Sequence, residues 1–277
     1  MWIDNVIILL AAGFLIGCLG TLIGAGGGFI LVPLLILTHP QLTPGVVTAI
    51  SIAIVACNAV SGSIAYARSK RINFRAGILF ALFTIPGSIL GVQVVKHVPS
   101  NLFSILFGLL MIVLGIFLFL NKKVPVSEIA IDKNNNVWKH YEQTDREGVK
   151  YTYSYNQLAG ILISIVVGFI SPILGIGGGI IHVPALVRWL KFPVHIATAT
   201  SHFILAIMSI TSVITHIKQG SYNDPYVYRM VLLLCAGVIP GAQLGAYFSH
   251  HIKGNTIIKA LAVCLAIVGV RVFFQGV

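Results

Sequence analysis

Residues 24–33 read GAGGGFILVP, and residues 175–184 read GIGGGIIHVP, at an offset of 151. Both copies lie inside long apolar stretches, where three consecutive glycines are poor helix formers. The similarity extends further along the chain, because residues 48–51 (TAIS) match residues 198–201 (TATS) in the same order. These matches predict an internal duplication of two homologous halves. A Gly-interrupted apolar segment in each half is typical of the substrate site of a membrane carrier.

The composition is that of an integral membrane protein. Hydrophobic residues make up 57% of the 277 positions and charged residues only 9%, against about 25% charged residues in a soluble chain. Apolar blocks of roughly 20 residues or more are long enough to cross a bilayer. We therefore expect an all-α polytopic membrane protein whose surroundings are the lipid bilayer.

The formal net charge of +11 does not indicate a nucleic-acid partner. The basic residues lie between the apolar blocks, where the positive-inside rule places them in cytoplasmic loops. A nucleic-acid binder would instead gather them on one face together with aromatic residues. The charge thus fits a multi-pass protein of a cytoplasmic membrane.

Three regions follow from the hydropathy pattern. Residues 1–120 and 157–277 each hold four apolar blocks, and residues 121–156 form a polar linker. The first block of each half has about 34 residues, which is too long for one untilted crossing and short for two. The glycines split this block, so we expect Gly-broken or re-entrant helices and 8–10 transmembrane segments in total.

Matched loops carry different charges in the two halves. The loop after the second block contains Arg68, Lys70, Arg71 and Arg75, whereas its counterpart contains Lys218 and Arg229. Such differences are expected if matched loops face opposite sides of the membrane. The sequence therefore favours an inverted repeat with five segments per half, with the linker cytoplasmic on either count.

The linker contains a predicted β-hairpin. Its DKNNN run at residues 132–136 is typical of a turn, and residues 137–141 and 149–155 read as strands. The sequence leaves open whether this hairpin is regulatory or inert.

The glycine runs predict an anion site. A helix that restarts inside the membrane presents unpaired N–H groups and the positive end of its dipole. Gly26, Gly27 and Gly28 would begin one such half-helix, and Gly177, Gly178 and Gly179 the other. The alternative interpretation is close helix packing through small residues.

Four polar residues within the apolar blocks are candidates for the same site: Ser51, Asn58, Ser201 and His202. Ser51 and Ser201 are matched across the repeat, a buried amide such as Asn58 needs partners, and histidine supplies a switchable charge. Each of them also has a structural alternative as a helix–helix hydrogen-bond partner. The apolar blocks contain no Asp or Glu, which cation carriers keep in the membrane, so an anionic substrate is favoured.

No catalytic or metal motif is found in the sequence. G-x-S-x-G, H-E-x-x-H and a P-loop are absent, and the four cysteines lie singly without C-x-x-C spacing. We therefore expect no enzymatic activity, no metal and no cofactor.

The paired G-x-G-G-G-[FI]-I-x-V-P motifs resemble those of the TauE/SafE sulfite exporter family. Residues 85–91 (IPGSILG) and 239–245 (IPGAQLG) also resemble that family, and the similarity covers the chain except the linker. The resemblance implies transport of a small sulfur anion, such as sulfite, thiosulfate or a sulfonate, across the bacterial cytoplasmic (inner) membrane.

Two hypotheses of function follow. The first is a secondary transporter for a small sulfur-containing anion, working by alternating access around the glycine motifs, with export favoured because the membrane potential drives anions outward. The second is a membrane scaffold or sensor whose glycines only pack helices and whose linker binds a partner. The sequence leaves both a monomer and a homodimer open.

Overall fold

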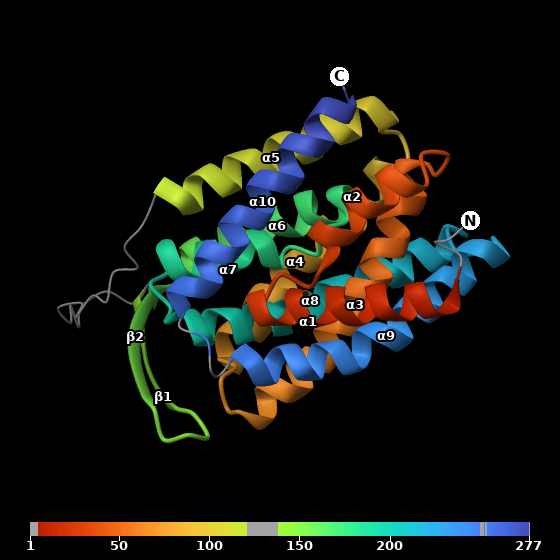
Figure 1. Ribbon diagram of the computed structural model, residues 1–277. Coiled ribbons are helices and arrows are strands. Elements are labelled where there is room, and N and C mark those ends of the chain that lie inside the picture. Colours follow the sequence, from red (N-terminus) through yellow and green to blue (C-terminus); the bar gives the residue numbers. More distant parts are fainter. Residues whose placement is uncertain (1–4, 121–137, 250–251, 253, 277) are drawn as a thin grey trace.

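The computed structural model describes residues 5–120, 138–249, 252 and 254–276. These residues form ten helices and one two-stranded sheet (Figure 1). In chain order the elements are α1 (Val6–Ile23), α2 (Gly28–Thr38), α3 (Pro44–Arg68), α4 (Phe74–Val95), α5 (Ser100–Leu120), β1 (Trp138–Thr144), β2 (Lys150–Asn156), α6 (Gln157–Leu174), α7 (Gly179–Arg188), α8 (Val194–Lys218), α9 (Pro225–Ser249) and α10 (Gly254–Gly276). The predicted all-α polytopic class is confirmed, with the hairpin as the only sheet in the part of the chain described.

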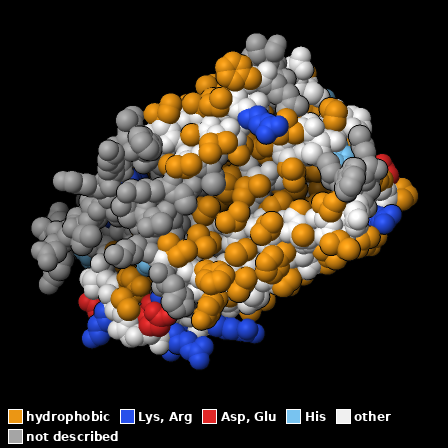
Figure 2. Space-filling view, in the orientation of Figure 1, with side chains coloured by type: hydrophobic (Ala, Val, Ile, Leu, Met, Phe, Trp, Pro, Cys, Tyr) orange, Lys and Arg blue, Asp and Glu red, His pale blue; other side chains and the backbone are white. Residues whose placement is uncertain are grey.

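Six of the described helices are long and apolar enough to cross a membrane, namely α1, α3, α4, α6, α8 and α9. Asparagine side chains cap several of them: Asn5 accepts from the Ile7 amide, Asn73 from Ala76 and Asn156 from Ala159. Such caps satisfy amides that lack an intrahelical partner. In Figure 2, apolar side chains cover the middle of the visible face, and most charged side chains lie towards its ends.

The α1–α2 pair enters and leaves the bundle at the same end. Leu9, near the start of α1, lies beside Tyr226 at the start of α9. His39, directly after α2, approaches the same residue, with 2.7 Å between His39 Nε2 and the Tyr226 hydroxyl. The chain therefore turns back at the glycines, and the predicted broken, re-entrant geometry is confirmed (Figure 1).

The α6–α7 pair also enters and leaves the bundle at one end, which is the end opposite to that of α1–α2. Tyr155 lies directly before α6 and Phe192 follows α7, and their ring centroids are 4.9 Å apart. We call this end, with β1 and β2, the hairpin end; the end with His39 and Tyr226 is the opposite end. The two helical pairs thus enter the bundle from opposite ends.

The first helix of each half packs along the fourth helix of the other half. Glycines allow the close approach: a methyl group on Gly17 of α1 would lie 2.5 Å from the Val238 carbonyl oxygen of α9, and one on Gly168 of α6 would lie 2.6 Å from the Thr84 carbonyl oxygen of α4. Such contacts between small residues are the usual means of packing membrane helices closely. The halves are therefore interlocked.

The central helices α3 and α8 run antiparallel. Tyr222 lies in the loop after α8, and its hydroxyl donates to the Ala49 carbonyl near the start of α3 over 2.8 Å. At the other end, Tyr66 near the end of α3 contacts His202 near the start of α8. Antiparallel packing of matched helices is what an inverted repeat requires, while the duplication itself stays a prediction.

The β-hairpin is present, but its predicted turn is wrong. Strand β1 pairs antiparallel with β2, with Trp138 opposite Asn156, and the chain turns at 145–149, where the Asp145 amide donates to the Val149 carbonyl over 3.1 Å. The predicted turn at 132–136 lies outside the described residues. Asp145 and Gly148 supply the turn chemistry that the sequence interpretation overlooked.

The hairpin is attached to the bundle through a buried ion pair. Arg71, in the α3–α4 loop, places NH2 2.9 Å from Asp145 Oδ2, and both residues are at most 5% exposed. The Asn73 amide also donates to the Tyr153 hydroxyl over 2.8 Å. Burial alone would raise the pKa of Asp145, but hydrogen bonds from Arg71 and from backbone amides hold this pKa below its ordinary value. The hairpin is therefore part of the folded bundle.

Candidate functional site

Two glycine corners form the centre of the molecule. The first corner has φ angles of 79° at Gly26 and 85° at Gly27, and the second has 76° at Gly177 and 80° at Gly178. Only glycine adopts this region without strain, which explains why each motif needs consecutive glycines. Helices α2 and α7 begin directly after these residues, at Gly28 and Gly179.

The corners leave buried amides without acceptors. At the first corner, the Ala25 and Gly26 amides donate to the Gly20 carbonyl over 2.8 and 3.1 Å. Within the described residues the amides of Gly27 and Gly28, and likewise those of Gly178 and Gly179, donate no hydrogen bond. All four residues are buried. Because buried amides are almost always paired, these donors at two helix N-termini favour a negatively charged ligand.

The two corners contact each other. The Ser51 hydroxyl of α3 donates to the Gly175 carbonyl over 2.6 Å, and a methyl group on Gly28 would lie 2.5 Å from the same oxygen. In the matched contact, Gly179 packs against the Gly24 carbonyl. The six glycines predicted for the site are thus brought together, with Ser51 beside them.

Apolar side chains cover the corners on one side. A methyl group on Gly26 would lie 2.5 Å from Cδ2 of Leu205, and one on Gly177 would meet Cγ1 of Val55. Val55 and Leu205 lie on α3 and α8, and both are fully buried. The structure therefore holds the corners closed.

A polar cluster lies beside the first corner, towards the hairpin end. The Thr21 hydroxyl donates to Asn58 Oδ1 over 2.6 Å and lies 3.3 Å from His202 Nε2. The Tyr66 hydroxyl donates to the Thr21 carbonyl over 2.7 Å, and its ring meets the His202 ring edge-on at 5.8 Å. Asn58 Nδ2 lies 2.8 Å from the position of a methyl group on Gly20, one turn before the corner.

Several polar atoms of this region are buried without a partner in the described part of the chain. They are Asn58 Nδ2, His202 Nδ1, Ser201 Oγ and Thr198 Oγ1. All four residues are at most 1% exposed. Unsatisfied buried donors that converge beside unpaired amides are the arrangement expected of a ligand site.

The sequence interpretation found Asn58, Ser201 and His202 but missed Thr21 and Tyr66. Thr21 is a polar residue three positions before Gly24 in an otherwise apolar block, which is a usable signal. Tyr66 looks like an ordinary residue at a helix end, and only its long-range bond reveals it. His182, inside the second motif, lies elsewhere, 3.4 Å from Ser164 Oγ.

Glycines outside the two motifs also pack helices closely. Gly13 and Gly17 on α1, with Gly237, Gly241 and Gly245 on α9, make the close helix contacts. None of these five has a positive φ. Gly26, Gly27, Gly177 and Gly178 differ from these five in their positive φ, whereas Gly28 and Gly179 also make close contacts.

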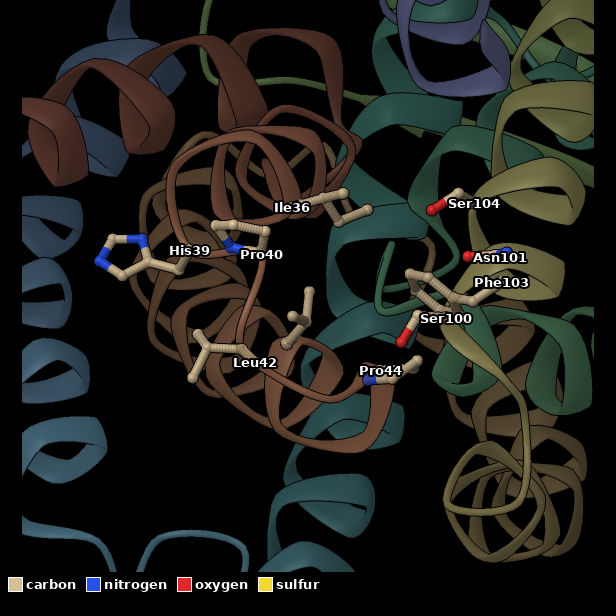
Figure 3. Close-up of a pocket in the computed structure, with 10 residues that line it drawn as sticks. Ile36, His39, Pro40, Leu42, Pro44, Ser100, Asn101, Phe103 and Ser104 are labelled. Atoms are coloured by element: carbon tan, nitrogen blue, oxygen red, sulfur yellow. The ribbon is translucent and has the colours of Figure 1, made fainter. Parts of the chain in front are cut away.

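Two surface cavities flank this centre. A cavity of about 160 Å³ lies at the opposite end, between the α2–α3 loop and the start of α5, where Ser100, Asn101 and Ser104 face Ile36 (Figure 3). The His39 ring turns away from it. A cavity of about 580 Å³ lies at the hairpin end, between α3, α9 and the β1–β2 turn.

A family model described as sulfite exporter TauE/SafE matches residues 9–272. The chain belongs to the TauE/SafE family. This confirms the resemblance found from the paired glycine motifs. The match spans both corners and the polar cluster, so the candidate site lies within the TauE/SafE region of the chain.

Relatives that match nearly the whole chain are described as probable membrane transporters. A probable membrane transporter protein of Bacillus subtilis is 34% identical and the alignment covers 98% of both chains. Others are probable membrane transporter proteins of Methanocaldococcus jannaschii, at 29% identity over 95% of this chain and 93% of the relative, and of Xylella fastidiosa, at 23% over 99% and 96%. No solved structure matches the chain. This TauE/SafE protein is therefore a multi-pass membrane transporter.

Proposed function

We propose that the chain is a secondary transporter for a small sulfur-containing oxyanion of the sulfite, thiosulfate or sulfonate type. The observation that carries the proposal is the meeting of two glycine corners whose buried amides have no acceptor in the described structure. The family description, sulfite exporter, supports the sulfur-containing class. Asn58, Ser51, Ser201 and His202 surround the anion in this proposal, with Thr21 holding the Asn58 carbonyl so that its amide nitrogen remains a donor.

In this proposal, alternating access uses the two re-entrant pairs. One pair enters from each end and their tips touch at the centre, so separating them on one side opens the site to that side only. Val55 and Leu205 would move with this separation, because each contacts both corners. The closed corners of the structure correspond to an occluded state in this proposal.

The hairpin end is the cytoplasmic end in this proposal. Basic residues are concentrated there, at Arg68, Lys70, Arg71, Arg75, Arg188 and Lys191, against Lys96, Lys218 and Arg229 at the opposite end. The positive-inside rule then places the linker in the cytoplasm. Outward movement of an anion gains about 2.3 kcal/mol per charge per 100 mV, so export needs no coupling ion.

Ligand-dependent thermal stability of the purified protein tests the proposal. The panel is sulfite, thiosulfate, sulfate, sulfoacetate, taurine, phosphate and chloride at constant ionic strength. A ligand at 100 times its Kd stabilises the folded state by about 2.7 kcal/mol. Selective stabilisation by a sulfur anion, lost in Gly27→Val and Gly178→Val, is expected; equal stabilisation by every anion would contradict a selective site.

The alternative, a scaffold whose linker binds a partner, predicts that removal of the linker abolishes function. Deleting residues 127–153 alone is a poor test, because it leaves the buried Arg71 without Asp145. The deletion should therefore be combined with Arg71→Met. The transporter proposal expects this variant to keep measurable anion flux across liposomes, even at a reduced rate, and complete loss of flux in a folded variant would favour the scaffold.

A further inference from the structure

The cavity at the hairpin end has a basic lining. The cavity has a volume of about 580 Å³. Its walls are Ala65 and Arg68 from α3, Ser69 directly after α3, Gln243, Ala246 and Tyr247 from α9, and Arg146 and Glu147 from the β1–β2 turn. The hairpin therefore supplies one wall and one of the two guanidinium groups. This cavity is separate from the glycine corners.

The carboxylates of Asp145 and Glu147 near the cavity pair with Arg71. Arg71 NH2 lies 2.9 Å from Asp145 Oδ2 and 3.4 Å from Glu147 Oε2. Within the described residues neither Arg68 nor Arg146 has an ion-pair partner, and both are exposed. Two unpaired guanidinium groups on one cavity favour an anion, and the guanidinium fork matches the geometry of an oxyanion.

The cavity is connected to the polar cluster through Tyr66. Ala246, which lines the cavity, packs with Tyr66 in one buried apolar cluster, and Ala65 lies against it. On its other side Tyr66 bonds to Thr21, which holds Asn58. A second link is Gln243, whose amide donates to the Ser61 carbonyl over 2.7 Å, one turn after Asn58. Tyr66 thus packs against residues of the cavity wall on one side and bonds to the polar cluster on the other.

The described part of the opposite end is built differently. The positions matched to Tyr66 and Asn58 by the offset between residues 48–51 and 198–201 are His216 and Met208. The cavity of about 160 Å³ at that end has no Lys or Arg in its lining, and a smaller one of about 30 Å³ has Arg229 alone. Among these described cavities, two arginines meet only at the hairpin end.

We propose that this cavity is an anion-binding vestibule, in which Arg68 and Arg146 hold the small oxyanion before it passes Tyr66 to the glycine corners. The proposal rests on the proposed function for the identity of the anion. It adds a second binding site, with side-chain cations in place of backbone amides, and makes the hairpin part of the transport machinery.

Charge-selective thiol labelling tests the vestibule without a transport assay. Ala65→Cys is introduced into the full chain with Cys18, Cys57, Cys235 and Cys264 changed to Ala. Its labelling rates are measured with two methanethiosulfonates, one carrying a sulfonate and one a trimethylammonium group. The ratio of the two rates cancels differences in thiol reactivity and access. Because electrostatic attraction raises encounter rates 10-fold or more at low ionic strength, Arg68→Gln/Arg146→Gln should lower the anionic-to-cationic ratio about tenfold.

The matched control is Lys139→Gln/Lys150→Gln, which removes the same charge from exposed hairpin positions outside the cavity. An equal fall in the control, or an unchanged ratio in the arginine variant, would overturn the proposal. Size-exclusion chromatography confirms that each variant is folded, and Arg68→Lys/Arg146→Lys should keep most of the selectivity. At about 1 M salt the Debye length is roughly 3 Å, so the ratio of the parent should fall towards that of the variant.

Occupancy is tested with sulfate, which does not react with the labelling reagents. Replacing chloride by sulfate at constant ionic strength should slow labelling of Ala65→Cys at least about twofold in the parent and leave the arginine variant unchanged. If the parent is labelled equally fast in sulfate and in chloride, the proposed anion site is overturned. Sulfate protection in a protein that carries none of the panel anions across liposomes would support the vestibule and refute the proposed function.

Discussion

Gly28→Ala tests whether the two corners are packed against each other. Gly28 is the first residue of α2 and its φ is not positive, so alanine fits the backbone. Helix propensity alone favours alanine over glycine by about 1 kcal/mol. Any destabilisation therefore reports the contact with the second corner.

The size of the effect follows from the contact distances. The new methyl group would lie 2.5 Å from the Gly175 carbonyl oxygen and 3.0 Å from Ser51 Oγ, where ordinary contact begins at 3.4 Å. The carbonyl belongs to the backbone of the other corner, so it does not move away by a side-chain rotation. Overpacking of this kind costs about 1–3 kcal/mol.

The assay is thermal denaturation of the purified protein in detergent, with Gly45→Ala as the control. Gly45 is also in the first turn of a helix, and a methyl group there would find its nearest neighbours at 3.8 and 3.9 Å, both in Lys96. We expect the Gly28 variant to be less stable than this control by about 1–3 kcal/mol. At about 2–4 °C per kcal/mol, its Tm should be roughly 2–12 °C lower.

A double variant sharpens the test. Gly179→Ala places a methyl group against the Gly24 carbonyl, which is the matched contact. This variant should therefore push apart the same two corners. Once one methyl group has separated them, the second should cost less, and the two effects should be less than additive. A Gly28 variant as stable as the Gly45 control, or strictly additive losses, would refute the packing of corner on corner.

Three further predictions concern the polar cluster and the hairpin. Asn58→Leu should reduce anion flux at least about tenfold in folded protein, because it removes a donor from the site. Met208→Leu, at the matched position of α8, should change flux little. Equal losses of flux in the two variants would contradict the role of Asn58. Tyr66→Phe keeps the ring but removes the hydrogen bond to Thr21, so it should lower the free energy of unfolding by about 0.5–1.5 kcal/mol. The measurement is the Tm of this variant compared with that of Tyr228→Phe, which changes an exposed tyrosine. Asp145→Asn should destabilise the protein at pH 6 and progressively less below about pH 4: the pKa of Asp145 is lowered by folding from about 3.9, so its stabilisation is complete above that value and is lost as the pH falls through the folded pKa. A difference in Tm between wild type and variant that does not shrink as the pH falls from 6 to 3 would show that the ion pair is not its cause.

The local geometry of the site could be predicted from the sequence, because glycine and proline act within a few residues. The glycine runs predicted both corners, where the structure places the breaks before α2 and α7. The pairing of α1 with α9 could not be predicted, since several apolar helices with glycines four residues apart offer similar faces. Thr21 and Tyr66 were missed for the same reason, because their partners are distant in sequence. The hairpin turn was misplaced because two polar runs, at 132–136 and 145–149, both carry turn residues.

The exchange of first helices between halves has a consequence for biosynthesis. Helix α1 ends at Ile23, but its partner α9 begins at Pro225, roughly 200 residues later. At about 5–20 residues per second, α1 waits roughly 10–40 s for its partner, with the glycine face that α9 will cover exposed to lipid or to the insertion machinery. The N-terminal re-entrant pair therefore meets its packing partner only once α9, which begins in the last fifth of the chain, has been made. Truncated chains that stop before α9 should be targets of membrane quality control, and a separately expressed C-terminal half should rescue them.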